Sequence, residues 1–132
     1  MSLGIDTSVL VRLLVGEPVP LAGKAKSRLL EAHRVREAVI VSDLVIAEAY
    51  HALKYHYEIA PADIRRSLLT MLTSGLVQPE PGSAALAVLQ AKAMGKAGLV
   101  DRLIHARYES DGMITLTFDK TQAKLGKAEF IG

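Results

Sequence analysis

The sequence has no cysteine and no long apolar run, and each absence excludes a class of protein. Without cysteine among its 132 residues, the chain has neither disulfide bridges nor thiolate zinc sites. No apolar segment reaches the ~20 residues that cross a bilayer, so no membrane span is expected. The N-terminus leads directly into a strand-like segment, which is unlike a signal peptide. Together these absences predict a cytoplasmic protein.

What is present indicates one folded domain. Half of the residues are hydrophobic, far more than disordered chains contain. A chain of this length buries most of its apolar surface in one core, so we expect a single domain over residues 1–132. The formal charge is +2, from 16 basic and 14 acidic side chains, which favours nucleic acid as a partner only weakly.

Strand-like and helix-like segments alternate along the chain. Short β-branched or apolar runs predict strands at 3–5, 39–41 and 113–118, with briefer ones at 76–77 and 130–131. Apolar spacing and capping residues predict helices at 7–15, 21–37, 43–57, 61–73, 83–95 and 100–110, and a helical turn at 120–125. In the second helix, Leu29 and Leu30 are placed on the buried face. This alternation predicts an α/β fold with parallel strands, covered by helices on both faces.

Four acidic residues lie where such a fold places functional groups. Asp6 and Asp119 each directly follow a strand, Glu48 lies two turns into the helix after the second strand, and Asp101 lies in the first turn of its helix. Each position also has a purely structural explanation. Asp6 and Asp119 are suited to cap the turns that follow them, and Asp101 favours the positive end of a helix.

Glu48 carries the strongest signal of the four. Val45, Ile46, Ala47 and Ala49 make its helix apolar on nearly every side, which predicts a buried helix and a buried carboxylate. A buried carboxylate needs a partner, and no basic residue nearby in the sequence offers one. A metal ion shared with the other acids would satisfy it.

Clustered carboxylates fit the chemistry of phosphodiester hydrolysis. Mg²⁺ and Mn²⁺ take oxygen ligands, lower the pKa of bound water and neutralise charge on phosphate oxygens. Without a metal ion the same carboxylates repel one another, and some would have to bind protons. Four acids in one pocket therefore predict a metal site that acts on an anionic substrate.

In these same segments the sequence resembles the PIN-domain family, especially its VapC-type toxin ribonucleases. The resemblance lies in an opening strand followed by Asp-Thr-Ser, a helical segment around the glutamate, a segment around the third acid and a closing Thr-x-Asp. These segments are 5–11, 46–49, 99–104 and 116–120. The ordered set is more specific than any one of them.

The resemblance implies a three-layer α/β/α fold with a parallel sheet of about five strands. It also implies an endoribonuclease that uses Mg²⁺ or Mn²⁺, forms homodimers and is held inactive by a small antitoxin protein. By position, the catalytic and metal-holding acids would be Asp6, Glu48, Asp101 and Asp119. Ser8 and Thr117 would support them through hydrogen bonds.

Three basic residues adjoin the acids and are expected to contact the RNA backbone. They are Arg12, Arg102 and Lys120. Cations of this kind supply most of the affinity for phosphate.

Three alternative functions stay open. A phosphatase of the haloacid dehalogenase type requires an acid two residues after the first one, where this chain has Ser8. A receiver domain requires adjacent acids near the first strand. A PIN-like module that only binds RNA or protein remains the non-enzymatic alternative. Among the histidines, His51 and His56 are spaced wrongly for one helix face, and His105 is interpreted as a core or surface residue.

Overall fold

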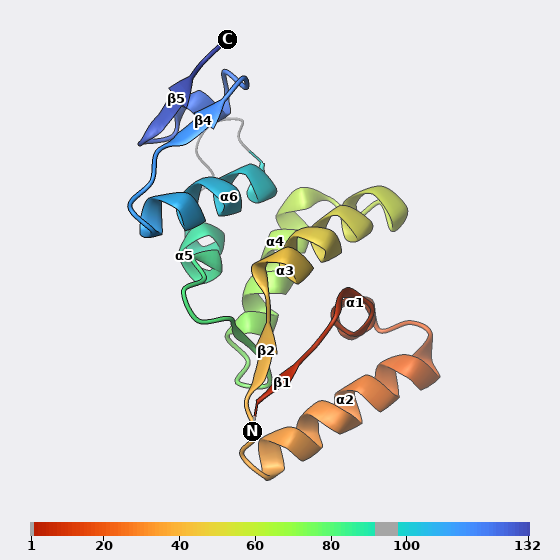
Figure 1. The fold of residues 1–132 in the computed structure, drawn as a ribbon. Helices are drawn as coiled ribbons and strands as arrows, with labels where there is room; N and C mark the ends of the chain where they lie inside the picture. Colours follow the sequence, from red (N-terminus) through yellow and green to blue (C-terminus); the bar gives the residue numbers. More distant parts are fainter. Residues whose placement is uncertain (1, 92–97) are drawn as a thin grey trace. The chain divides into compact units, whose positions relative to one another are not determined.

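Strands and helices alternate along the chain in the computed structural model, which describes residues 2–91 and 98–132 (Figure 1). Contacts divide the chain into two units, Met1–Pro81 and Gly82–Gly132. Each unit has its own helices and its own small parallel sheet. The predicted α/β class with parallel strands is therefore confirmed.

The first unit contains a parallel sheet in the order β1-β2-β3. Leu3 pairs with Val39, and Ile40 pairs with Gln78. Its elements are β1 (Leu3–Gly4), α1 (Thr7–Val15), α2 (Val19–Arg34), β2 (Val39–Val41), α3 (Asp43–His51), η1 (Ala52–His56), α4 (Pro61–Leu72) and β3 (Gln78–Pro79).

Local sequence signals set the ends of these helices. The Asp6 and Ser42 side chains cap α1 and α3 by accepting hydrogen bonds from backbone N–H groups three residues on. At the other end of α1, Gly16 has φ +77°, a left-handed conformation that glycine adopts without strain. Pro61 stands at the first position of α4, where a missing N–H costs nothing.

The helix that carries Glu48 differs from the prediction in its second half. The α-helix expected over 43–57 ends at His51, and η1 continues it as a π-helix. The N–H of Tyr57 accordingly donates to the carbonyl of Ala52, five residues back, over 3.2 Å.

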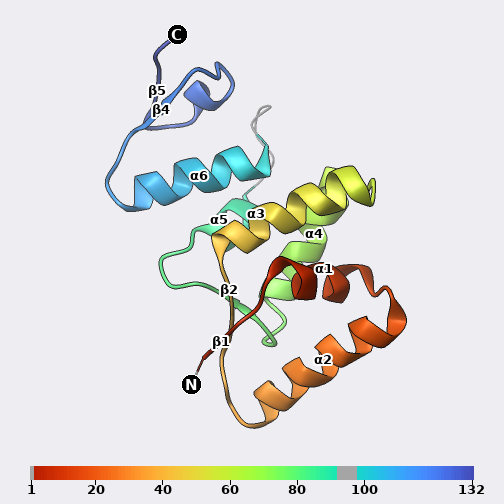
Figure 2. The same cartoon turned by 45° about the vertical axis from the view of Figure 1, so that its right-hand side comes forward.

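Apolar side chains from α1, α3, η1 and α4 form the core of the first unit. Leu10, Ile46, Leu53, Ile64 and Leu68 are all at most 1% exposed. The helix α1 packs against both α2 and α3 (Figure 2). Asp6, at the start of α1, is therefore attached to the best-packed part of this unit.

The second unit pairs β4 and β5 in parallel and packs α6 against α5 and β4 (Figure 1). Its elements are α5 (Ala85–Gln90), α6 (Leu99–Ser110), β4 (Thr115–Thr117), η2 (Gln122–Lys124) and β5 (Ala128–Phe130). In β4 the two threonines are buried and Leu116 between them is 62% exposed. The buried face of this strand is thus polar.

Several predicted boundaries were wrong. The sheet of about five strands is replaced, in the part of the chain that the structure describes, by sheets of three and two strands. The helix expected over 83–95 is α5, which ends at Gln90, and 92–97 lie outside the described residues. The strands expected at 76–77 and 130–131 lie at Gln78–Pro79 and Ala128–Phe130. Within the described ranges, no helix is both long enough and apolar enough to cross a membrane.

The placement of both Leu29 and Leu30 on the buried face of α2 was also wrong, because Leu29 is 4% exposed and Leu30 is 47% exposed. Consecutive helical residues point about 100° apart, so a narrow buried face admits only one of them. We expect Leu29→Ala to lower the free energy of unfolding by about 2–5 kcal/mol. Leu30→Ala is the matched control and should change it by less than about 1 kcal/mol. Equal losses in urea unfolding would contradict this description of α2.

Candidate active site

Asp6 connects β1 to α1 through hydrogen bonds within its own segment. Its Oδ1 accepts from the Ser8 hydroxyl at 2.6 Å and from the Val9 N–H at 3.1 Å. The helix-capping interpretation is therefore confirmed. The Ser8 hydroxyl bonds to Asp6, and its part in a catalytic site stays a prediction. Asp6 is nevertheless exposed, so its carboxylate can also bind a ligand.

The same contacts determine the charge of Asp6. The hydrogen bond from the Ser8 hydroxyl is the main cause that lowers the pKa of Asp6 below its usual 3.8. The N–H of Val9 lowers this pKa further, and desolvation opposes these two effects more weakly. The N–H of Ser8 and the positive charge of Arg12 lower the pKa by smaller amounts. Asp6 is therefore an anion at neutral pH, the state that a metal ligand requires.

Glu48 lies close to the Asp6 segment, because the Thr7 hydroxyl donates to its Oε2 at 3.3 Å. The prediction that Glu48 is buried was wrong, since its side chain is exposed. The apolar residues around it do not all face the core, and Leu44, one turn earlier, is 69% exposed. Exposure removes the argument that Glu48 must have a partner, but it leaves the carboxylate accessible to one.

The other two acids belong to the second unit. Asp101 is half-buried in the first turn of α6, and Asp119 is exposed two residues after the end of β4. Oδ1 of Asp119 accepts from the N–H groups of Thr121 and Gln122 at 2.7 and 3.3 Å. Its own N–H donates to the Thr117 hydroxyl at 2.9 Å. Asp119 therefore caps the turn that follows it. Thr117 bonds to its backbone, and the part of Thr117 in a catalytic site stays a prediction.

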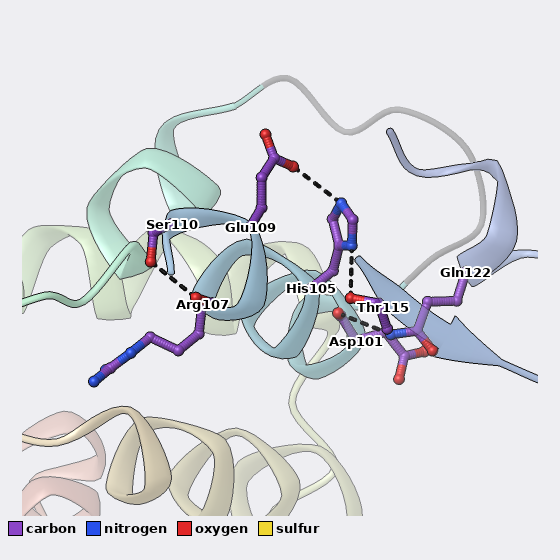
Figure 3. Close-up of polar contacts among 7 residues, drawn as sticks. All are labelled: Asp101, His105, Arg107, Glu109, Ser110, Thr115 and Gln122. Atoms are coloured by element: carbon purple, nitrogen blue, oxygen red, sulfur yellow. Dashed lines mark hydrogen bonds and ion pairs between the residues drawn. The ribbon is translucent and has the colours of Figure 1, made fainter. Parts of the chain in front are cut away.

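Gln122 joins these two acids and was missed in the sequence. Its Nε2 donates to the backbone carbonyl of Asp101 at 3.3 Å (Figure 3). Its Oε1 accepts from the Thr117 hydroxyl at 3.2 Å. The available signal was the spacing, because Asp119 and Gln122 are separated like the two residues of a capping box. In that motif the glutamine side chain would bond back to the N-cap N–H, whereas here it extends to α6.

His105, on α6, is a core histidine that contacts the buried polar face of β4. Its Nδ1 lies 3.0 Å from the Thr115 hydroxyl, and its Nε2 lies 3.1 Å from Oε2 of Glu109 (Figure 3). The Nε2 contact is close but is not aligned as a hydrogen bond. His105 thus connects α6 with β4 and is separate from the chain of bonds through Gln122.

The basic residues expected to bind RNA lie in different environments. The Arg12 guanidinium is half-buried and donates to the Ser8 carbonyl at 3.3 Å. Lys120 is exposed, with its ammonium 5.9 Å from the centre of the Phe130 ring. Arg102 is half-buried next to Asp101. Their contacts with RNA stay a prediction.

A cavity of about 460 Å³ adjoins Asp6 in the first unit. Its walls are largely apolar side chains from β1, α1 and α2, and Asp6, Ser8 and Arg28 are its polar members. Arg28 is not among the basic residues that the sequence led us to expect at the site. Arg28 thus lines the same cavity as the first acid.

The acids thus fall into two pairs, one in each unit, and hydrogen bonds join the segments of each pair. In the described part of neither unit do three or more histidine and acidic side chains come close enough to hold a metal ion. The convergence of all four carboxylates stays a prediction. The donor set itself suits a hard divalent cation, because carboxylates held by hydrogen bonds from their own chain are typical ligands of Mg²⁺.

Comparison with known proteins identifies a family. The sequence matches the PIN domain over residues 4–128, which includes both units and all four acids. No curated protein and no solved structure matches the chain.

The capping role of Asp6 has a measurable consequence for stability. Asp6→Ala should lower the free energy of unfolding by about 1 kcal/mol, because the first turn of α1 loses its acceptor. Asp6→Asn should be close to the wild type, since asparagine caps helices equally well. Asp63→Asn in the first turn of α4, where Asp63 pairs with Arg66 on the surface, is a control expected to change little. A loss for Asp6→Asn as large as for Asp6→Ala would contradict the capping role.

The lowered pKa of Asp6 predicts how this contribution depends on pH. A carboxyl group whose pKa is lower in the folded state stabilises the fold above its unfolded pKa. That contribution is lost as the pH falls through the folded pKa, which lies below 3.8. We expect Ser8→Ala to raise the pKa of Asp6 toward 3.8, measured by NMR titration of the carboxyl carbon. An unchanged pKa would show that the Ser8 hydroxyl is not its main cause.

Proposed function

Since the chain belongs to the PIN-domain family, which indicates nuclease activity, we propose that it is a metal-dependent endoribonuclease that hydrolyses RNA phosphodiester bonds. The observation that carries this proposal is the family match over residues 4–128, within which all four acids lie. Two of them, Asp6 and Asp119, are exposed carboxylates fixed by their own backbone.

In this proposal Asp6, Glu48, Asp101 and Asp119 together hold Mg²⁺ or Mn²⁺. PIN domains generally use divalent metal ions. Such an ion supplies a water molecule of lowered pKa and offsets the negative charge of the phosphate. The four carboxylates in turn keep the site anionic, so that it binds cations in preference to free phosphate.

The neighbouring hydroxyl groups prepare the carboxylates for this role. Ser8 donates to Asp6, and Thr7 donates to Glu48. Each hydrogen bond limits the rotation of its acceptor, and the bond from Ser8 also stabilises the ionised form of Asp6. On the other pair, Thr117 fixes the backbone of Asp119 through the N–H of that residue. The chain therefore orients three of the four ligands before any metal binds.

The activity test uses Asp6→Asn, which should keep the cap of α1, so that a loss of catalysis is separated from a loss of folding. Purified protein with Mg²⁺ or Mn²⁺ should cleave RNA, and a chelator should stop the cleavage. Asp6→Asn should lose about a hundredfold or more of turnover, because several kcal/mol of charge stabilisation disappear. Its melting temperature should stay near that of the wild type. Equal cleavage by both proteins would instead indicate a contaminating nuclease.

The same variant distinguishes the alternative functions. A module that only binds RNA would retain its RNA affinity in Asp6→Asn and would show no metal-dependent cleavage in the wild type. A phosphatase would release phosphate from small phosphate monoesters. This chain has Ser8 where a phosphatase of the haloacid dehalogenase type requires an acid, so we expect no such release.

We further propose that the chain acts as the VapC-type toxin of a toxin–antitoxin pair and forms a homodimer. The antitoxin would be a small, partly disordered protein that folds onto the surface around Asp6 and Glu48. An arginine from such a partner suits these carboxylates, because guanidinium pairs with carboxylate through two parallel hydrogen bonds. The exposed Tyr55 and Tyr57 beyond Glu48 offer apolar contacts.

Expression of the chain with and without its neighbouring open reading frame tests the toxin role. The chain alone should arrest growth, the co-expressed neighbour should restore it, and a small protein should co-purify. Asp6→Asn is the matched control and should be harmless when expressed alone. If the wild-type chain alone is harmless and nothing co-purifies, the toxin role fails while the nuclease proposal stands.

Analytical ultracentrifugation of the purified chain tests the proposed homodimer and should show a dimer.

A further inference from the structure

Gln122 is a buried amide with both of its polar atoms in use. It opens η2 and is 8% exposed. Its Nε2 bonds to α6 (Figure 3). Its Oε1 bonds to β4, a separate element of the second unit. A buried amide without partners is costly, so these two bonds hold Gln122 in a single orientation.

The groups at the two ends of this series of hydrogen bonds, the N–H of Asp119 and the carbonyl of Asp101, determine which partner donates in each bond. The N–H of Asp119 donates to the Thr117 hydroxyl oxygen, so the Thr117 proton is free to point to Oε1 of Gln122. Nε2 of Gln122 then donates to the carbonyl of Asp101. A continuous path of three hydrogen bonds therefore connects the backbones of Asp119 and Asp101. Gln122 makes two of them, because its amide offers both an acceptor for Thr117 and a donor for Asp101.

Gln122 also holds Asp119 directly. Its backbone N–H donates to Oδ1 of Asp119 at 3.3 Å, alongside the shorter bond from Thr121. One residue thus contacts a carboxylate oxygen of one acid and the backbone carbonyl of the other. The side-chain bond is the part that mutation can remove, because a substitution leaves the backbone N–H in place.

We propose that Gln122 is a positioning residue that sets the separation and orientation of Asp101 and Asp119 for metal binding. This inference rests on the proposed function, in which both acids hold the ion. Groups that hydrogen-bond to metal-binding segments commonly change metal affinity by about 10–100-fold when they are replaced. The side chain of Gln122 does not touch the metal in this proposal and acts only through the two segments.

The test compares variants of Gln122 with a matched glutamine. Gln122→Met keeps the length of the side chain but removes both hydrogen bonds, and Gln122→Glu places a carboxylate oxygen against the carbonyl of Asp101. Gln90→Met, at the exposed end of α5 in the same unit, is the control. Mn²⁺ affinity is measured by calorimetry on the full-length protein without RNA, well below the melting temperature of each variant.

We expect Gln122→Met and Gln122→Glu to weaken Mn²⁺ binding about tenfold or more. Gln90→Met should bind like the wild type. With RNA, the loss should appear in the Mn²⁺ concentration needed for half-maximal cleavage rather than in the KM for RNA. Hydrogen exchange at the Asp119 amide should also be faster in Gln122→Met, since its acceptor, Thr117, loses its partner.

Thr117 provides an independent route to the same bond. Thr117→Val removes the hydroxyl, whereas Thr117→Ser keeps it. Mn²⁺ affinity should fall in the first and be retained in the second. Combining Thr117→Val with Gln122→Met should cost little more than Thr117→Val alone, because both break one path. If Gln122→Met does not fold, the comparison of Thr117→Val with Thr117→Ser tests the role of this hydrogen bond instead.

The outcomes separate this inference from the proposed function. Wild-type protein that neither binds Mn²⁺ nor cleaves RNA would overturn both. Wild-type protein that does both, with Gln122→Met and Thr117→Val retaining wild-type Mn²⁺ affinity, would overturn only the role of Gln122. A lower melting temperature with unchanged affinity in these variants would also overturn that role, because it shows a purely structural residue. Weaker binding in both variants, with recovery in Thr117→Ser, supports the proposal.

Discussion

The first N–H groups of a helix have no partner within the helix, and the need to satisfy them governs where this chain places its acids. Asp6 accepts from the Val9 N–H where β1 passes into α1, and Asp119 accepts from two N–H groups where β4 passes into η2. Both carboxylates are held in place by the backbone that they stabilise. The same requirement that ends a strand and starts a helix therefore prepares two anionic ligands at the carboxyl ends of strands.

This dual use explains why the structural and functional interpretations of the acids do not exclude each other. A capping hydrogen bond engages one carboxylate oxygen through its lone pair, and a metal ion requires only a ligand oxygen of the ionised group. Ser8 serves both purposes, because its hydroxyl fixes Asp6 at the end of the helix and keeps its pKa low. An asparagine in place of Asp6 is suited to the first role and loses the charge required for the second.

In the second unit, a longer series of hydrogen bonds holds the segments that carry the acids. The buried face of β4 carries threonines, and their hydroxyls meet polar partners: His105 for Thr115, Gln122 for Thr117. Such a polar interior is stable only when its members are paired, so it specifies one arrangement of α6 against β4. That arrangement determines where Asp101 stands relative to Asp119, a relation that an apolar core would hold less specifically.

The sequence by itself determined the features that depend on neighbours along the chain. The order of strands and helices, the caps at Asp6 and Ser42, the end of α1 at Gly16 and the support of Asp6 and Asp119 by Ser8 and Thr117 all arise from residues a few positions apart. Their physical causes are local hydrogen bonds and backbone preferences, which short sequence patterns record. The four segments that resemble the family all lie within the match over 4–128.

Only the tertiary structure decided which faces of the helices are buried and which distant residues meet. Apolar neighbours predicted a buried Glu48, yet its helix turns this residue and Leu44 to solvent, because packing against α1 covers only part of the helix surface. Leu29 and Leu30 look alike in the sequence, and only one of them faces the core. The bond from Gln122 to Asp101 spans 21 residues, and no local rule connects two such positions. Burial and long-range hydrogen bonds depend on how elements pack, and that is a property of the whole fold.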